Sequence, residues 1–318
     1  MLLFSLALIA GLALLVWSAD HFVNSSVATA RNLGMTPMLI GLTVVAFGTS
    51  APEMIVSATA AFSGASDLAI GNAIGSNIAN IGLVLGVTAI ISAIPIRPIV
   101  LRRELPVLVC TSILACFLLL DGSLSHLDGI LLIAMLAGSL FILSRNHIDT
   151  HELDEEVAEI PEMKTGKAIL FLVGSLLILL ASSKLLVWSA TEIARTLGVS
   201  ELIIGLTIVA IGTSLPELAA SVVSALKGHH DIALGNVIGS NLFNLLAVMA
   251  MPAFISQPMI SHDVLYRDYP VMLAITFALA TLAYIMRQKG NIGRVTGVSF
   301  VSVYGIYLFG LFLSNHSG

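Results

Sequence analysis

The pattern of hydrophobic positions divides the chain into long apolar segments separated by short polar ones. A membrane-spanning helix needs about 20 mostly apolar residues. Residues 130–143 are apolar on every face instead of alternating with polar positions, which predicts helices and not barrel strands. We therefore expect an all-α membrane protein with ten transmembrane helices, over residues 2–22, 38–62, 70–93, 105–120, 127–145, 167–190, 202–226, 232–255, 268–286 and 293–313.

The composition supports the same conclusion. Of the 318 residues, 57% are hydrophobic and 10% are charged, whereas a soluble domain carries about 25% charged residues. A soluble fold is therefore excluded, the lipid bilayer is the expected environment, and no nucleic-acid partner is expected. The first apolar segment follows Met1 without a basic stretch, so we expect a retained helix and not a cleaved signal peptide.

The distribution of Lys and Arg predicts the orientation in the membrane. Eleven of the fourteen basic residues lie in the loops that follow odd-numbered spans, whereas the opposite side holds only Arg195 and Arg267, and Lys184 lies inside a span. Because basic loops stay in the cytoplasm, both termini are expected on the non-cytoplasmic side. The expected location is the inner membrane of a prokaryotic cell.

The sequence repeats itself once. GLTVVAFGTSAPEM at 41–54 returns as GLTIVAIGTSLPEL at 205–218, and GNAIGSNIAN at 71–80 returns as GNVIGSNLFN at 235–244, both at an offset of 164. Such self-similarity indicates two homologous halves. Each half holds five predicted spans, an odd number, so the repeats are inverted relative to the membrane. We expect one five-helix repeat at 1–145, an acidic cytoplasmic linker at 146–166 and a second five-helix repeat at 167–318.

Glu53 and Glu217 occupy equivalent positions near the middle of two predicted spans. An ionised carboxylate at that depth costs at least about 2.5 kcal/mol, so such residues are functional by default. One isolated Glu could be kept protonated for packing, but a pair at equivalent positions favours a functional role. Transporters with inverted repeats bind substrate at the repeat interface near the midplane, and we expect the site there.

Both Glu residues follow the sequence Gly-Thr-Ser-X-Pro. The proline cannot donate to the carbonyl four residues earlier, at Gly48 or Gly212, so a break in each helix is predicted. The freed carbonyls are expected to join the Thr and Ser hydroxyls in one cluster of oxygens. Spans three and eight each add a polar stripe at i, i+4 and i+8 spacing, which we expect to face the carboxylates. These stripes are Asn72, Ser76, Asn80 and Asn236, Ser240, Asn244.

Only oxygen ligands are on offer in these segments, without paired His or Cys. This donor set suits Na⁺, Ca²⁺ or Mg²⁺ and disfavours zinc or copper. The two carboxylates carry a charge of −2, which one Ca²⁺ or two Na⁺ would neutralise. Competition between these ions for one site would produce obligatory exchange.

The two segments resemble the α-repeats of the calcium/cation antiporter superfamily, with GTSAPE and GTSLPE as the hallmark and GNAIGSN and GNVIGSN as its companion. The resemblance covers both halves and is closest to prokaryotic, K⁺-independent sodium/calcium exchangers. It implies ten helices, an outside N-terminus, and Na⁺-driven Ca²⁺ export by alternating access. The transported Ca²⁺ and Na⁺ would be substrates, and neither a cofactor nor an enzymatic activity is expected.

The resemblance also implies roles for individual residues. Ca²⁺ would be bound by Glu53, Glu217, Thr49 and Thr213. Na⁺ would be bound by Ala46, Ser50, Ser76, Asn80, Ala210, Ser214, Ser240 and Asn244. Some relatives carry Asp at the positions of Asn80 and Asn244, so the amides in this chain weaken any inference of K⁺ co-transport.

Three alternatives stay open at the level of sequence. Proton/calcium exchangers of the same superfamily add a Glu within the second motif, and this chain has none there, so proton coupling is the second choice. A cation channel would present the same static site. An intramembrane hydrolase using Ser with Glu would need a general base, and neither GTS motif has a His nearby in sequence.

Overall fold

The computed structural model describes residues 1–145, 163–199, 204, 207–208, 210–287 and 290–314. The acidic residues of the predicted linker all precede residue 163 and lie outside the described residues. Within the described part, seven helices are long and apolar enough to cross a membrane, and a bent pair of helices makes an eighth. Two shorter segments, Val100–Leu119 and the second GTS helix, occupy the places of the remaining two predicted spans. The ten-helix architecture is confirmed.

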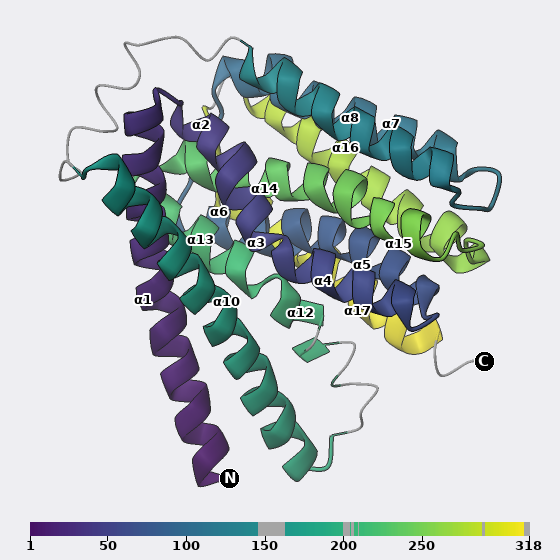
Figure 1. Ribbon diagram of the computed structural model, residues 1–318, viewed down its shortest axis with the longest axis horizontal. Helices are drawn as coiled ribbons and strands as arrows, with labels where there is room; N and C mark the ends of the chain where they lie inside the picture. Colours follow the sequence, from purple (N-terminus) through teal and green to yellow (C-terminus); the bar gives the residue numbers. More distant parts are fainter. Residues whose placement is uncertain (146–162, 200–203, 205–206, 209, 288–289, 315–318) are drawn as a thin grey trace.

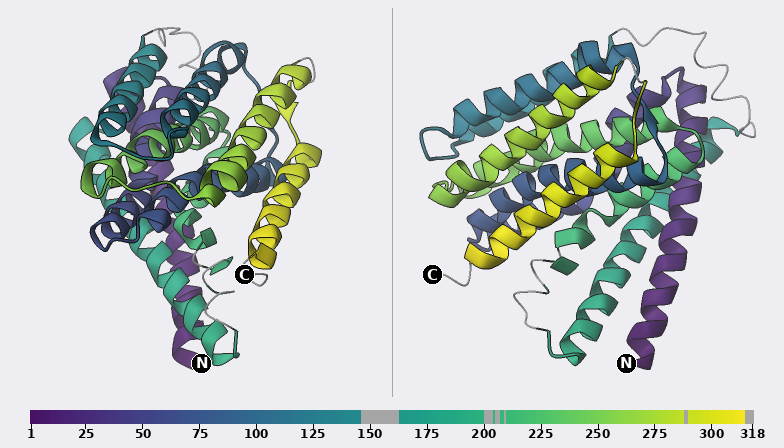
Figure 2. Two further views of the ribbon diagram at one scale, coloured as in Figure 1. Left: turned by 90° about the vertical axis from the view of Figure 1, so that its right-hand side faces the viewer. Right: turned by 180° about the vertical axis from the view of Figure 1, so that it is seen from behind.

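Two long helices form an arm beside the main bundle. They are α1 (Leu2–Leu33) and α10 (Thr165–Thr196), each of 32 residues. They pack along each other and cross the other helices at a steep angle (Figures 1 and 2). Gly11 permits the close approach, because a Cβ atom there would lie 3.0 Å from Leu186 Cγ. These first helices of the two repeats therefore form one paired unit.

The GTS segment of each repeat is a helix broken at its serine. In the first repeat α2 (Pro37–Ile40), the π-helical turn η1 (Gly41–Val45) and α3 (Ala46–Thr49) lead to α4 (Ala51–Phe62), with a bend of 42°. In the second repeat α12 (Ala210–Thr213) leads to α13 (Leu215–Leu226). The break predicted from the proline is confirmed in both repeats.

The GN segments form the two most buried spans. The first comprises α5 (Ser66–Ala79), the π-helical turn η2 (Asn80–Leu85) and α6 (Gly86–Ile91), and the second comprises α14 (His230–Leu242), η5 (Phe243–Val248) and α15 (Ala250–Ile255). The protein buries 72% and 83% of their most apolar windows, against 22–33% for the other unbent spans. These two helices therefore form the centre of the bundle, with the lipid-facing helices around them.

The remaining elements enclose this centre and connect the halves. They are η3 (Val100–Glu104), α7 (Leu105–Leu119) and α8 (His126–Ser144) in the first repeat, and η6 (Val264–Asp268), α16 (Tyr269–Met286) and α17 (Arg294–Ser314) in the second. The short strands β1 (Ile94–Pro95) and β2 (Asn291–Ile292) pair antiparallel. This pairing joins the loops after spans three and nine, which the span count places on one side of the membrane.

The two repeats meet backbone to backbone where α14 crosses η1. Gly235 and Gly239 stand four residues apart, a spacing typical of close helix packing in membranes. A Cβ atom on Gly239 would lie 2.5 Å from the carbonyl oxygen of Leu42, and one on Gly41 would lie 2.8 Å from that of Ile232. Only glycine fits at these contacts, so the motif glycines place the polar stripe of α14 directly against the first GTS segment.

Candidate ion-binding site

Each Glu lies in the first turn of the helix that follows the break. Ser50 and Ser214 have nearly identical backbone angles (φ −81°, ψ 2° and φ −88°, ψ 4°), and each precedes a helix with proline in its first turn. Glu53 and Glu217 occupy the third residue of α4 and α13. The N-terminus of a helix carries partial positive charge, so each break places a region of positive potential beside a carboxyl group.

Both carboxylates are buried at the interface of the two repeats. Glu53 is 0% exposed and Glu217 is 1% exposed. Ser50 of the first repeat donates to Glu217 Oε1 of the second at 3.4 Å. Among the described residues, Glu217 Oε2 and both carboxylate oxygens of Glu53 have no hydrogen-bond partner. Burying such atoms unpaired is costly, so these oxygens indicate a ligand.

Three further predicted residues share this property. The side chains of Asn80, Ser214 and Asn244 are at most 1% exposed, and their polar atoms lack a hydrogen-bond partner in the part of the chain that the structure describes. Asn80 opens η2, and Asn244 lies in η5. π-Helical turns within membrane helices are often found at functional sites. Oxygens left unpaired in this way are suited to a cation.

The polar stripe of α14, which was predicted to face the carboxylates, contacts the first GTS segment at Thr49. The Thr49 hydroxyl lies 3.4 Å from Ser240 Oγ and donates to Asn236 Oδ1 at 3.1 Å. Asn236 Nδ2 in turn donates to the backbone carbonyl of Glu217 at 3.2 Å. The first repeat shows the equivalent bond, from Asn72 Nδ2 to the carbonyl of Glu53 at 3.1 Å. The two stripes therefore reach the two Glu residues through their backbone.

Gly212, one of the two residues whose carbonyls the prolines free, is bonded to a side chain outside the motif. Its carbonyl accepts a hydrogen bond from Ser183 Oγ of α10 at 3.0 Å. The first repeat has Ala19 at the position equivalent to Ser183, and Leu176 of α10 packs against Gly48 there. A hydroxyl on a helix outside the motif thus satisfies the carbonyl, and the motif sequence alone could not reveal this.

The two halves of the site are buried to different degrees. Thr49 and Asn236 are both 0% exposed, whereas their repeat equivalents Thr213 and Asn72 are only half-buried. The other predicted residues keep their expected elements: Ala46 opens α3, Ser76 is buried in α5, and Ala210 opens α12. The site is therefore more accessible from the side of α12 and α5 than from the side where α14 closes on η1.

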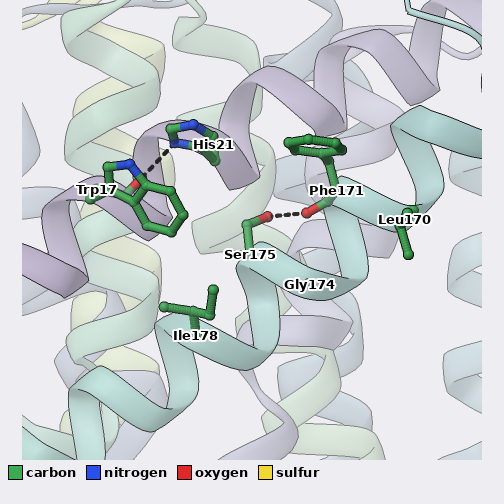
Figure 3. Close-up of a pocket in the computed structure, with 7 residues that line it drawn as sticks. All are labelled: Trp17, His21, Leu170, Phe171, Gly174, Ser175 and Ile178. Carbon is green, nitrogen blue, oxygen red and sulfur yellow. Dashed lines mark hydrogen bonds between the residues drawn. The ribbon is translucent and has the colours of Figure 1, made fainter.

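The site is distinct from the cavity between α1 and α10. That cavity, of about 260 Å³, is lined by Trp17, His21, Leu170, Phe171, Gly174, Ser175 and Ile178 (Figure 3). Its lining is almost wholly apolar and carries no carboxylate. It lies on the arm and offers nothing to hold a cation.

The family model for the sodium/calcium exchanger protein matches residues 3–145 and 167–313 of this chain. The chain belongs to the sodium/calcium exchanger family. This family consists of membrane antiporters that transport Ca²⁺ and Na⁺, so the protein is an integral membrane transporter and not an enzyme. The hydrolase alternative is excluded.

Individual relatives and a solved structure agree with the family. The chain is 45% identical to "Putative antiporter CaxA" of Alkalimonas amylolytica, over 99% of this chain and 100% of that protein. It is 41% identical to the inner membrane protein YrbG of Escherichia coli, over 97% and 96% of the two chains. It superposes on the sodium-calcium exchanger NCX_Mj soaked with Na⁺ and Ca²⁺ with a TM-score of 0.83 and 33% identity, over 98% of this chain and 99% of that chain.

Proposed function

We propose that this member of the family is a secondary active antiporter that exchanges Na⁺ for Ca²⁺ by alternating access. The observation that carries the proposal is the pair of buried carboxylates, Glu53 and Glu217, at the interface of the two repeats. Three of their four oxygens lack a hydrogen-bond partner among the described residues. Hard oxygen ligands with a total charge of −2 suit one Ca²⁺ or several Na⁺.

Ca²⁺ is assigned to Glu53, Glu217, Thr49 and Thr213. Ca²⁺ takes six to eight oxygens in flexible geometry, and two carboxylates with two hydroxyls supply most of them. Na⁺ is assigned to sites around this centre. These sites comprise the carbonyls of Ala46 and Ala210 with the side chains of Ser50, Ser76, Asn80, Ser214, Ser240 and Asn244.

Alternating access is supported by the unequal burial of the two halves. The repeats are nearly identical in sequence at the site, so exchanging their conformations would open the side that is now closed and close the other. The arm formed by α1 and α10 is our candidate for the moving part, because its side chains are absent from the assigned ligand set. In this conformation Lys227 at the end of α13 binds Asp20 of α1 at 2.6 Å and Asn24 of α1 at 2.8 Å.

Proton coupling is the alternative within the same family. The names of CaxA and YrbG specify no ion, and two carboxylates can carry protons as well as Na⁺. Na⁺ is favoured because the GN segments contribute hydroxyls and neutral amides, including those of Asn80 and Asn244, and no third carboxylate. An amide can coordinate Na⁺ but cannot bind a transported proton near neutral pH.

The deciding experiment measures Ca²⁺ uptake into vesicles reconstituted with the full chain. An outward Na⁺ gradient at equal pH should drive uptake, and a pH gradient without Na⁺ should not. Uptake driven by the pH gradient alone would establish proton coupling. Uptake that runs down the Ca²⁺ gradient, with neither a Na⁺ gradient nor a pH gradient imposed, would indicate a channel.

We also propose that the protein lies in an inner membrane with both termini on the non-cytoplasmic side. The charge count supports this orientation, and the pairing of β1 with β2 places two of the basic loops together. Single cysteines replacing Glu155 and Asn315 test it in intact cells. An impermeant thiol reagent should label position 315 and not position 155, and the reverse pattern would invert the topology.

A further inference from the structure

The amide of Asn236 joins three segments of the protein at the proposed ion site. Asn236 lies in α14 and is 0% exposed. Its Nδ2 donates to the carbonyl of Glu217 at 3.2 Å and to Ser221 Oγ at 2.9 Å, both in α13, and its Oδ1 accepts from Thr49 Oγ1 of α3 at 3.1 Å. One side chain therefore connects a Glu of the second repeat to a Thr of the first.

These bonds use both donor hydrogens of the amide, and its oxygen is turned to Thr49. An asparagine side chain offers two hydrogens and one carbonyl oxygen, so Asn236 has no free donor and its oxygen is held by the protein. Asn80 and Asn244 are the last residues of the two stripes, and neither of their amide atoms has a hydrogen-bond partner among the residues that the structure describes. The stripes thus contain two kinds of asparagine, and Asn236 is of the kind that binds protein.

The bond to Thr49 controls which atoms that hydroxyl can offer to a cation. A hydroxyl has a single hydrogen and two lone pairs, and the acceptor nearest to Thr49 Oγ1 is Asn236 Oδ1, at 3.1 Å against 3.4 Å for both the Ala46 carbonyl and Ser240 Oγ. With the hydrogen directed to Asn236, the lone pairs of the Thr49 oxygen remain acceptor sites that a cation can use. Without this acceptor, the hydrogen would turn toward the Ala46 carbonyl, the Ser240 hydroxyl or the Glu217 carboxylate, all of which are proposed ligands.

The bond to the backbone controls the position of the carboxylate. The carbonyl of Glu217 lies in the first turn of α13, directly after the break, where fewer helical hydrogen bonds hold the chain. The equivalent Asn72 makes the same bond to Glu53. The first repeat differs in one respect, because Ser57, the equivalent of Ser221, donates instead to the carbonyl of Ala69 at 2.9 Å.

We propose that Asn236 and Asn72 are positioning residues of the ion site, which fix the backbone of Glu217 and Glu53 without contacting the ion, and that Asn236 in addition orients the hydroxyl of Thr49 across the repeat interface. This inference rests on the proposed Ca²⁺ site. It predicts unequal effects on the two ions, because Thr49 is assigned to Ca²⁺ alone and the flanking Na⁺ sites use other oxygens.

The test measures equilibrium binding of Ca²⁺ and Na⁺ to the purified full-length protein. Asn236→Ala should weaken Ca²⁺ binding about ten- to a hundredfold, the range found when a residue that orients a metal ligand is removed, and weaken Na⁺ binding several times less.

A double-mutant cycle separates positioning from a general structural role. If Asn236 acts through Thr49, the effects of Asn236→Ala and Thr49→Val on Ca²⁺ affinity will not be additive. Asn77→Ala is the matched control, because Asn77 is also buried in a GN segment, and its Nδ2 donates only to Ala73 of its own helix at 2.8 Å. It should leave the ratio of Ca²⁺ to Na⁺ affinity unchanged, whatever it does to thermal stability.

Several results would overturn the inference. They are additive effects in the cycle, equal losses for Ca²⁺ and Na⁺ in Asn236→Ala, or an equal change of the affinity ratio in Asn77→Ala. In each of these cases a wild-type protein that still binds Ca²⁺ in competition with Na⁺ would leave the proposed function intact. A wild-type protein that binds neither ion would refute both.

Discussion

At the scale of single residues, the two Glu side chains at the site combine full burial with oxygens that lack a hydrogen-bond partner among the described residues. Glu53 and Glu217 carry all of the formal charge of the proposed ion site, since the neighbouring stripes contribute hydroxyls and amides. A carboxylate at this depth is tolerated only when something compensates it. Helix N-termini supply part of that compensation, and a bound cation would supply the rest.

Neutralising either carboxylate should therefore abolish Ca²⁺ transport. Glu53→Gln and Glu217→Gln each remove half of the charge that attracts a divalent ion, while the side chain keeps its shape and the protein remains folded. Na⁺-driven Ca²⁺ uptake should fall to the level of empty vesicles. Glu192→Gln is the matched control, because Glu192 pairs with Arg195 near the end of α10 and should retain wild-type uptake. Normal uptake in either site variant would show that the carboxylates do not bind Ca²⁺.

At the scale of elements, the contact between α14 and η1 closes one side of the site. Backbone atoms of the two segments touch at Gly41, Gly235 and Gly239, so small residues let α14 bring Asn236 and Ser240 to Thr49. The same contact explains why this half of the site is fully buried. Its geometry leaves no room for a methyl group.

Adding one methyl group at this contact should destabilise the protein. In Gly239→Ala the new Cβ would lie 2.5 Å from the carbonyl oxygen of Leu42, and overpacking of this kind typically costs about 1–3 kcal/mol. Thermal unfolding in detergent should show a lower midpoint. Gly138→Ala provides the comparison, because no described atom lies within 4 Å of a Cβ at Gly138 of α8. An unchanged midpoint in Gly239→Ala would mean that the helices separate at little cost.

The arm formed by α1 and α10 should have to move for transport. Lys227 links α13 to Asp20 and Asn24 of α1, so cysteines at positions 24 and 227 can be joined by a short bifunctional thiol reagent, in a background without Cys110 and Cys116. Joining them should stop Ca²⁺ exchange and preserve Ca²⁺ binding, because neither residue belongs to the assigned ligand set.

A second cross-link controls for the effect of the reagent. Cysteines at Pro95 and Asn291, which are paired in the β1–β2 ladder, join two loops without touching the arm, and exchange should continue after they are linked. Exchange at the normal rate with α1 fixed to α13 would show that the moving element lies elsewhere.

At the scale of the whole molecule, the charge of the site determines whether exchange carries current. With a site charge of −2, one Ca²⁺ leaves the loaded protein neutral, and three Na⁺ leave it at +1. Exchange of three Na⁺ for one Ca²⁺ would then move one net charge per cycle. Across a membrane potential this is worth about 2.3 kcal/mol per 100 mV.

Ca²⁺ uptake into Na⁺-loaded vesicles should therefore respond to an imposed potential. Uptake of one Ca²⁺ against release of three Na⁺ moves one positive charge outward, so an inside-positive potential should accelerate it and an inside-negative potential should slow it. The potential is set with K⁺ and valinomycin, with equal K⁺ on both sides as the control. Uptake that is Na⁺-dependent but indifferent to potential would indicate two Na⁺ per Ca²⁺.

The sequence alone determined the architecture and most of the proposed ligand set. Hydrophobic runs long enough to span a bilayer predict helices whatever their neighbours, because an exposed backbone in lipid must satisfy its own hydrogen bonds. The repeat at an offset of 164 placed Glu53 and Glu217 at equivalent positions, and the proline before each Glu predicted the broken helices. These features depend on local chemistry and on comparing one half of the chain with the other.

Only the tertiary structure decided how the two repeats interlock. The hydrogen bonds from Thr49 to Asn236 and from Ser50 to Glu217 join residues more than 160 positions apart. Ser183, on a helix outside the motif, donates a hydrogen bond to the carbonyl of Gly212. The sequence could not predict the unequal burial of Thr49 and Thr213 either, because two nearly identical motifs predict the same surroundings. Packing breaks that symmetry: in a single conformation α14 can close against η1 on one side of the site while the equivalent side stays more open.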